Sequence, residues 1–157
     1  MFPLSKCYTP EDQAELAAEW AVVDRHFAEA SPQAEMRRWE YAMALRAYRR
    51  WRENRSGATL CYDIGGAGSP FRRMIGAPDG HVMVVDPQGE PGDWKDTLGN
   101  FMQGGTELGH VVCCLSVLEH IEDLPQFLYH LACLTAPGGL LFLTVDYDPS
   151  LSEKDEF

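Results

Sequence analysis

A glycine-rich turn follows a short apolar run in the first half of the chain. The turn is Asp63-Ile-Gly-Gly-Ala-Gly68, and the apolar run spans residues 59–64. Glycines let the backbone approach a ligand closely, and a helix that begins just after the turn would offer free N–H groups. A second apolar run ends on Asp86, 23 residues after Asp63. An acid in that place is typical of a carboxylate that hydrogen-bonds a ribose diol, so the two features predict an adenosine-bearing cofactor.

The spacing of the glycines distinguishes between two classes of cofactor. A dinucleotide site has the pattern G-x-G-x-x-G, whereas this chain has Phe71 where the third glycine after Gly66 and Gly68 would stand. The acid Asp63 would repel a pyrophosphate but would attract the ammonium and sulfonium charges of S-adenosylmethionine. The residues therefore favour S-adenosylmethionine, and an oxidoreductase that uses a nicotinamide cofactor is the weaker alternative.

Four short segments extend this pattern along the chain. They are Asp63-Ile-Gly-Gly-Ala-Gly68, Val84-Val-Asp86, Leu115-Ser-Val-Leu-Glu-His-Ile121 and Leu134-Thr-Ala-Pro-Gly-Gly-Leu-Leu141. On these segments, the region 59–147 resembles the class I S-adenosylmethionine-dependent methyltransferases, in particular the small-molecule-type group with a V-L-E-H motif. Each segment alone is a weak signal, but the four together, in this order and spacing, are specific.

The resemblance implies roles for individual residues. Asp63 and Gly65 would line the methionine end of the cofactor, Asp86 would hold the ribose hydroxyls, and residues 116–119 would form the wall beside the transferable methyl group. The full set expected to bind the cofactor is Asp63, Gly65, Gly66, Gly68, Asp86, Pro87, Ser116, Val117 and Glu119. No metal ion is expected.

The chain departs from the family pattern in three places. Ala67 and Ser69 stand where the family has glycines, and Gly109-His110 stands where it usually has Phe-Asp. The acid that contacts adenine has no clear counterpart. Asp96 and Asn100 are the candidates for it.

The chemistry that the resemblance implies asks little of the protein. Methyl transfer from a sulfonium is an in-line displacement, so alignment supplies most of the rate and a base is needed only if the acceptor must lose a proton. His120 is the candidate catalytic base, and Tyr147 and Asp148 follow the last strand near the same edge. The structural alternative is that Glu119 and His120 only cap and orient the backbone at a strand-to-helix junction.

Hydrophobic periodicity predicts the elements that position these residues. Two helices are expected over residues 9–30 and 31–54, and the first carries an apolar stripe of Leu16, Trp20, Val23 and Phe27. Continuous apolar strands are expected at 59–64, 81–86, 111–117 and 140–145, with a helix over 123–134 between the last two. No strand is predicted between residues 87 and 109. This order predicts an α/β fold with a doubly wound, mainly parallel Rossmann-like sheet.

The predicted organisation is a single domain. Residues 1–56 form a helical segment that packs on a cofactor-binding core of residues 57–157. By the resemblance, the sheet stops after the fifth strand of the family fold, which leaves strand 140–145 as an apolar edge that invites another chain. A second copy, a partner chain or the remainder of a longer protein is expected to cover this edge. The alternative function is therefore a non-catalytic or partner-dependent binding module with the methyltransferase fold, or a fragment of a longer methyltransferase.

Composition limits the class of protein. The 157 residues are 45% hydrophobic and 24% charged, as in ordinary globular domains, and the net charge of −11 argues against non-specific binding to nucleic acid. Seven arginines nevertheless lie between residues 37 and 55, either as a solvated face that pairs with acids or as a site for a phosphate-bearing acceptor. The chain shows no secretory signal and no apolar run long enough to cross a bilayer. Five cysteines without a C-x-x-C motif favour free thiols and a cytoplasmic location.

Overall fold

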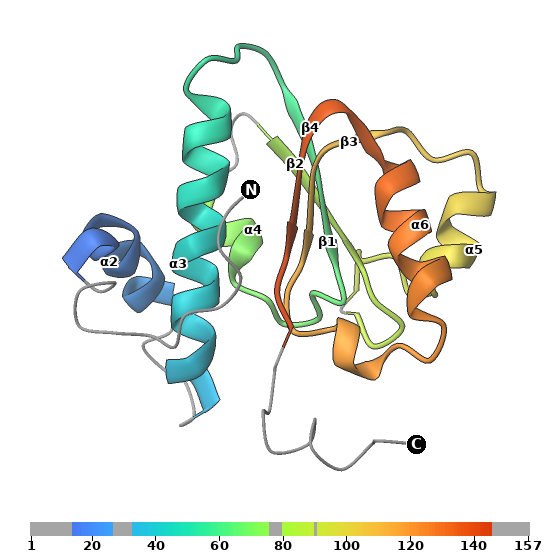
Figure 1. Cartoon of the computed structure of the whole chain (residues 1–157), viewed down its shortest axis with the longest axis horizontal. Helices are drawn as coiled ribbons and strands as arrows, with labels where there is room; N and C mark the ends of the chain where they lie inside the picture. The colour runs from blue at the N-terminus through green and yellow to red at the C-terminus, as the bar shows by residue number, and fades with distance from the viewer. Residues whose placement is uncertain (1–13, 27–32, 76–79, 90, 146–157) are drawn as a thin grey trace, which may run out of the picture.

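The computed structural model describes residues 14–26, 33–75, 80–89 and 91–145 of the chain. These residues form three layers, in which a parallel sheet lies between α2, α3 and α4 on one face and α5 and α6 on the other (Figure 1). The described helices are α2 Ala17–His26, α3 Gln33–Arg52, α4 Phe71–Met74, α5 Leu98–Gln103 and α6 Leu124–Leu134, with a 3-10 helix η1 at Leu118–His120. The predicted Rossmann-like α/β architecture is therefore confirmed.

The sheet has the strand order β2-β1-β3-β4, and every neighbouring pair is parallel. Its strands are β1 Thr59–Ile64, β2 Gly80–Val85, β3 Gly109–Cys114 and β4 Thr135–Leu143. The chain passes from β1 outward to β2 and then crosses back to build β3 and β4 on the other side of β1. The direction of winding thus reverses between β1 and β3, and open α/β sheets bind ligands at the carboxyl ends of the strands at such a point.

Burial on both faces explains why the strands read as continuous apolar runs. Cys113 packs in a cluster with Tyr41 and Phe71 on one face, whereas Cys114 packs with Leu131 and Leu134 on the other. The two adjacent thiols thus point to opposite faces, as successive residues of a strand do. Burial also raises the pKa of Cys61 and Cys114 to about 12, so both thiols stay protonated at neutral pH.

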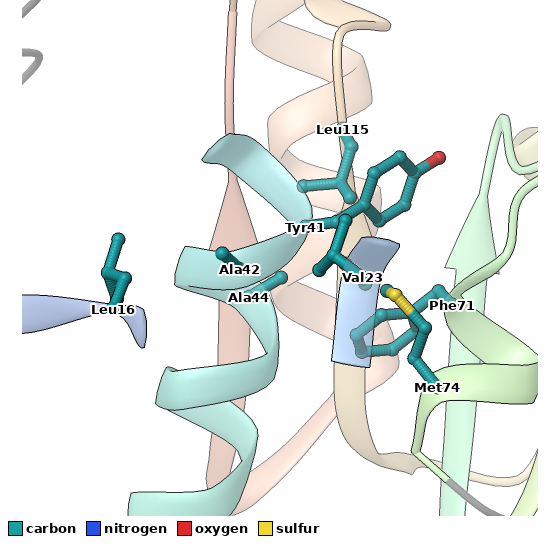
Figure 2. Packing of buried hydrophobic residues seen from close by; sticks show 9 residues of the cluster. Leu16, Val23, Tyr41, Ala42, Ala44, Phe71, Met74 and Leu115 are labelled. Atoms are coloured by element: carbon teal, nitrogen blue, oxygen red, sulfur yellow. The ribbon is translucent and has the colours of Figure 1, made fainter. Parts of the chain in front are cut away.

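The predicted apolar stripe of the first helix is confirmed where the structure describes it. Leu16 and Val23 are buried and Trp20 packs against the same cluster, while Phe27 and the predicted helix starts at residues 9 and 31 lie outside the described residues. Figure 2 shows Val23 among side chains from α3, α4 and the residue after β3, which include Tyr41, Phe71 and Leu115. The helix pair is thereby fixed to one face of the sheet.

Part of the arginine face of α3 pairs with acids of the α2 segment. Arg38 lies 3.5 Å from Asp24, Arg46 lies 3.5 Å from Glu15, and Arg49 lies 2.9 Å from Glu19. Exposed pairs of this kind contribute about 0–1 kcal/mol each. They orient α2 on α3 more than they stabilise the fold. The arginines at the end of α3 form no ion pair with the α2 segment.

The stretch between β2 and β3, where no strand was predicted, contains one parallel bridge and one short helix. Trp94 forms an isolated parallel bridge with Val85, the last residue of β2. Its N–H donates to the Val84 carbonyl at 2.9 Å, and its carbonyl accepts from Asp86 N at 3.0 Å. Helix α5 follows, and its Phe101 ring packs edge-on against Trp94 at a centroid distance of 5.2 Å. Tertiary packing, rather than a periodic pattern in the sequence, forms these two features.

Strand β4 begins earlier than residue 140, where the sequence placed its start. It runs from Thr135 to Leu143 and includes Pro137-Gly138-Gly139, and its register with β3 shifts between Gly109 and Val111. The Pro-Gly-Gly segment therefore lies inside an irregular strand and is not a separate turn.

Among the described residues, no helix has both the length and the apolar character needed to cross a membrane.

Leu131 on α6 tests the packing of the second face. Its side chain is completely buried, whereas Leu128 on the same helix is 37% exposed. Leu131→Ala leaves a cavity, so we expect it to lower the free energy of unfolding by about 2–5 kcal/mol, against about 1 kcal/mol or less for Leu128→Ala. Urea unfolding followed by circular dichroism measures both values. Equal losses for the two variants would contradict the assigned orientation of α6.

Candidate functional site

Buried polar side chains gather at the carboxyl ends of the strands. Asp63 near the end of β1, Asp86 after β2 and Ser116 after β3 are all buried, and Glu40 of α3 joins them. Buried carboxylates are costly unless they are hydrogen-bonded or serve a ligand. Their concentration at the point where the winding of the sheet reverses makes this edge the candidate functional site.

The glycine turn between β1 and α4 has no room for side chains at its first two positions. Gly65 has a φ of +71°, and a Cβ there would overlap the side chain of Val117. A Cβ at Gly66 would lie 2.5 Å from Oδ2 of Asp63. Gly68 also has a positive φ, of +70°, but open space surrounds it. The turn therefore follows a path that glycine alone adopts without strain, directly over the carboxylate of Asp63.

Asp63 lies deeper than the sequence suggested. The sequence placed this acid at the mouth of a site, but its side chain is 2% exposed and lies beneath Gly66 on the face that carries α3 and α4. Ser69 forms a side-chain hydrogen bond with it, while its Oδ2 atom has no hydrogen-bond partner among the described residues. Burial raises the pKa of Asp63 to about 6, an effect that Ser69 and Arg72 partly offset.

Asp86 links the glycine turn to the end of β2. Its Oδ2 atom accepts a hydrogen bond from Ala67 N at 3.0 Å, and its Oδ1 atom accepts one from Gln88 N at 2.7 Å. An ionised carboxylate offers about four acceptor positions, so Asp86 retains capacity for further donors. Pro87, the next residue, is exposed.

Ser116 and Glu40 form a buried pair, of which the sequence predicted only Ser116 as a site residue. The Ser116 hydroxyl donates to both carboxylate oxygens of Glu40, at 2.9 and 2.8 Å, and Ser116 has an unusual φ of +50°. Glu40 was not predicted as a site residue. Its spacing in the sequence could have indicated a buried position. Glu40 precedes Ala44 by four residues and Tyr48 by eight, and this spacing places the acid on the buried side of an arginine-rich helix.

Tyr41, the next residue on α3, joins the helix to the glycine turn. It forms a side-chain hydrogen bond with Ser69, and burial raises the pKa of its hydroxyl to about 12. The hydroxyl therefore stays protonated at neutral pH. Ser69, predicted as a departure from the family pattern, connects Tyr41 and Asp63.

The segment after β3 divides into a part that faces the glycine turn and a part that faces solvent. Val117 meets Gly65, whereas Glu119 and His120 in η1 are exposed. Within the described residues, no hydrogen bond or ion pair holds the imidazole of His120. The structure thus brings Gly65 and Val117 together but does not bring His120 into contact with the buried acids.

The two candidates for an adenine contact bind one another. Asp96 Oδ1 accepts from Asn100 Nδ2 at 2.8 Å and from Thr97 N at 2.7 Å, at the start of α5.

Tyr147 and Asp148 lie outside the described residues. Among residues 14–26, 33–75, 80–89 and 91–145, no group of three or more His, Cys, Asp or Glu side chains could hold a metal ion.

The described residues fit an adenosine-bearing, positively charged cofactor. The spare acceptor capacity of Asp86 suits hydroxyl donors, the buried carboxylate of Asp63 would attract a positive charge, and the side-chain-free turn at Gly65 and Gly66 allows close approach. No protein-family model matches the chain, and no curated protein is similar enough in sequence to count as a relative. The site must therefore be interpreted from its own geometry.

The raised pKa of Asp63 predicts a pH-dependent effect on stability. The pKa rises from 3.8 to about 6 on folding, so the folded state is favoured while Asp63 is protonated and loses that advantage as the pH rises through 6. We expect Asp63→Asn, which cannot ionise, to gain about 2 kcal/mol in free energy of unfolding relative to the parent chain between pH 4 and pH 7.

Urea unfolding over that pH range measures the difference between parent and variant. The matched control is Glu53→Gln, because Glu53 is exposed near the end of α3. Its difference from the parent is expected to stay within about 0.5 kcal/mol at every pH. Parallel pH profiles for Asp63→Asn and the parent would contradict the assigned burial of the carboxylate.

Proposed function

We propose that the chain binds S-adenosylmethionine at the carboxyl edge of the sheet and transfers its methyl group to an acceptor. Small molecules are one class of acceptor that this proposal includes. The observation that carries this proposal is the pairing of Asp86 with the glycine turn, where the Ala67 amide donates to the carboxylate at 3.0 Å. That contact sets a carboxylate beside a side-chain-free turn next to the reversal of the sheet, as a ribose site requires. The resemblance in the four sequence segments supports the same cofactor.

The charges at this edge support a cationic ligand over a pyrophosphate. Asp63 and Asp86 lie against the glycine turn, Glu40 lies at the same edge of the sheet through its hydrogen bonds with Ser116, and Arg72 is engaged with Asp93 at 2.8 Å. Acidic groups in a partly buried setting attract an ammonium or sulfonium and repel phosphates. Because Asp63 is buried under Gly66, it would act on the ligand through its charge, while Asp86 would hydrogen-bond the ribose hydroxyls directly.

The bridge at Trp94 supports the choice of Asp96 as the candidate for the adenine contact. In the resembled family, the acid that contacts adenine follows the third strand, and Asp96 comes two residues after the single bridge that Trp94 makes with Val85. We propose Asp96, held by Asn100, as the residue beside adenine. S-adenosylmethionine would supply the methyl group, and the protein would supply its alignment with the acceptor.

The alternative is a binding module that keeps the fold and the cofactor site without turnover. The observation that favours it is the exposed His120, since the described residues place nothing against its imidazole that would orient it as a base. Acceptors that need no deprotonation would make the histidine dispensable.

The buried, protonated thiols of Cys61, Cys113 and Cys114 agree with the proposed cytoplasmic location.

Binding of S-adenosylhomocysteine, the product of methyl transfer, tests the cofactor site by isothermal titration calorimetry. We expect saturable binding to the parent chain and a loss of about ten-fold or more in affinity for Asp86→Ala, because a hydrogen bond to a charged group contributes about 1.5–3 kcal/mol. Glu107→Gln changes the same charge at an exposed position before β3 and is expected to bind like the parent. No heat with the parent chain would overturn the proposal.

The outer edge of β4 is the proposed place for a second copy of the chain or for a partner. β4 is last in the strand order, and none of the described residues pairs with its outer side. Residues Leu140 to Leu143 are only partly buried, which suits an edge that another chain covers.

Light scattering over a range of protein concentrations tests this edge. We expect the mass of a dimer, because two parallel-sheet edges can pair through their free backbone groups. A constant monomer mass at high concentration would contradict self-association, and pairing with a different chain would then be the remaining proposal for this edge.

A further inference from the structure

An open pocket lies at the end of the sheet opposite to the acidic site. Its volume is about 210 Å³, and its walls include Trp51, Arg52, Arg55, His110, Gly138 and Gly139. These residues come from the end of α3, the segment after it, and the beginnings of β3 and β4. Figure 1 shows the loop from α3 into β1 at this end of the sheet, while the chain leaves β4 at the other end.

Backbone carbonyls hold the two arginines of the pocket in place. Arg52 donates to the carbonyls of Arg55 and Gly57 at 2.7 and 2.8 Å, and Arg55 donates to those of Trp51 and Gly138 at 2.7 and 3.0 Å. The Arg55 guanidinium also stacks on the Trp51 ring, with its central carbon 4.6 Å from the ring centroid. Both cations are therefore oriented by the protein before any ligand arrives.

The charge of these two arginines is not neutralised within the described part of the chain. No described carboxylate forms an ion pair with Arg52 or Arg55, in contrast to Arg38, Arg46 and Arg49 further back on α3. A guanidinium carries five N–H donors, and the hydrogen bonds to carbonyls occupy two on each side chain. Donors and positive charge thus remain available at one small pocket of a protein with a net charge of −11.

His110 adds a third donor. Its Nδ1 atom accepts a hydrogen bond from Leu60 N at 3.1 Å, so the proton of the neutral ring sits on Nε2, which is then a donor. Gly138, with a φ of +73°, has open space around the position of a side chain. The pocket therefore combines fixed donors with a wall that leaves room for a ligand.

We propose that this pocket binds the phosphate group of a small phosphate monoester. A phosphate presents several oxygens that arginine forks bind bidentately, and it can accept from two guanidiniums and an imidazole together. The six residues of β1 at roughly 3.3 Å each separate the pocket from the carboxyl edge, so the ligand is neither the cofactor nor an acceptor aligned with it. The inference is independent of the proposed methyl transfer.

Calorimetric titration at constant ionic strength, set with sodium chloride, tests the pocket with two probes: inorganic phosphate and glycerol phosphate. We expect saturable binding of both, with tighter binding of the ester because the pocket has room beyond the phosphate. The double variant Arg52→Gln/Arg55→Gln is expected to lose about ten-fold or more in affinity for either probe. Arg50→Gln removes one positive charge from an exposed position on α3 outside the pocket wall, and it is expected to bind like the parent.

Circular dichroism checks that the double variant folds. If it does not, Arg55→Lys replaces it, because lysine keeps the charge but loses the planar fork, and about ten-fold weaker binding is expected. No saturable heat with either probe on the parent chain would overturn the proposal. Equal losses for Arg50→Gln and the pocket variant would also overturn it, because such a result describes general charge attraction. Tighter binding of inorganic phosphate than of the ester would reject the monoester and identify free phosphate as the ligand.

Discussion

The burial of one carboxylate, that of Asp63, constrains the carboxyl edge of the sheet more than any other single interaction. Because the side chain is 2% exposed, its neighbours must supply what water does not. Ser69 hydrogen-bonds it, Tyr41 on α3 bonds to the same serine, and Arg72 of α4 offsets part of the charge. Glycine is required at position 66 because its backbone passes directly over the carboxylate. One acid thus links β1, the glycine turn, α3 and α4.

The sequence was sufficient to predict the sheet because its strands are covered on both faces and therefore read as apolar runs. The predicted strand 81–86 ends on Asp86, one residue beyond β2, whereas the predicted strand 111–117 runs past the end of β3 at Cys114 and so includes Ser116. The predicted helix start at residue 123 agrees with the structure, in which Asp123 caps α6 and its carboxylate accepts from Gln126 N at 3.1 Å. The depth of Asp63, the contact of Glu40 with Ser116 and the bridge at Trp94 could not be predicted. Each depends on which element folds over which, and a short-range pattern does not contain that information.

Helix α3 gives the two ends of the sheet opposite electrostatic character. Its twenty residues span roughly 30 Å, and Figure 1 shows it running beside the sheet in the direction opposite to β1. Glu40 therefore lies at the carboxyl ends of the strands, and Arg52 lies at their beginnings. Between them, Arg46 pairs with Glu15 just before α2 and Arg49 pairs with Glu19 within α2. A single helix thereby contributes an acid to one site and cations to another, and the net charge of −11 conceals this division.

The shortness of α4 bears on the kind of ligand that the glycine turn attracts. A long helix after such a turn concentrates positive potential at its first amides and favours phosphates. Here α4 has four residues, no side-chain cap at Pro70, and one of its first amides, Phe71 N, already donates to Ser69 Oγ at 3.1 Å. The helix therefore adds little positive potential at the turn, and the acids Asp63 and Asp86 dominate the local field. A turn that would otherwise suit a pyrophosphate is in this chain better matched to a cation, which is the charge of the cofactor proposed for it.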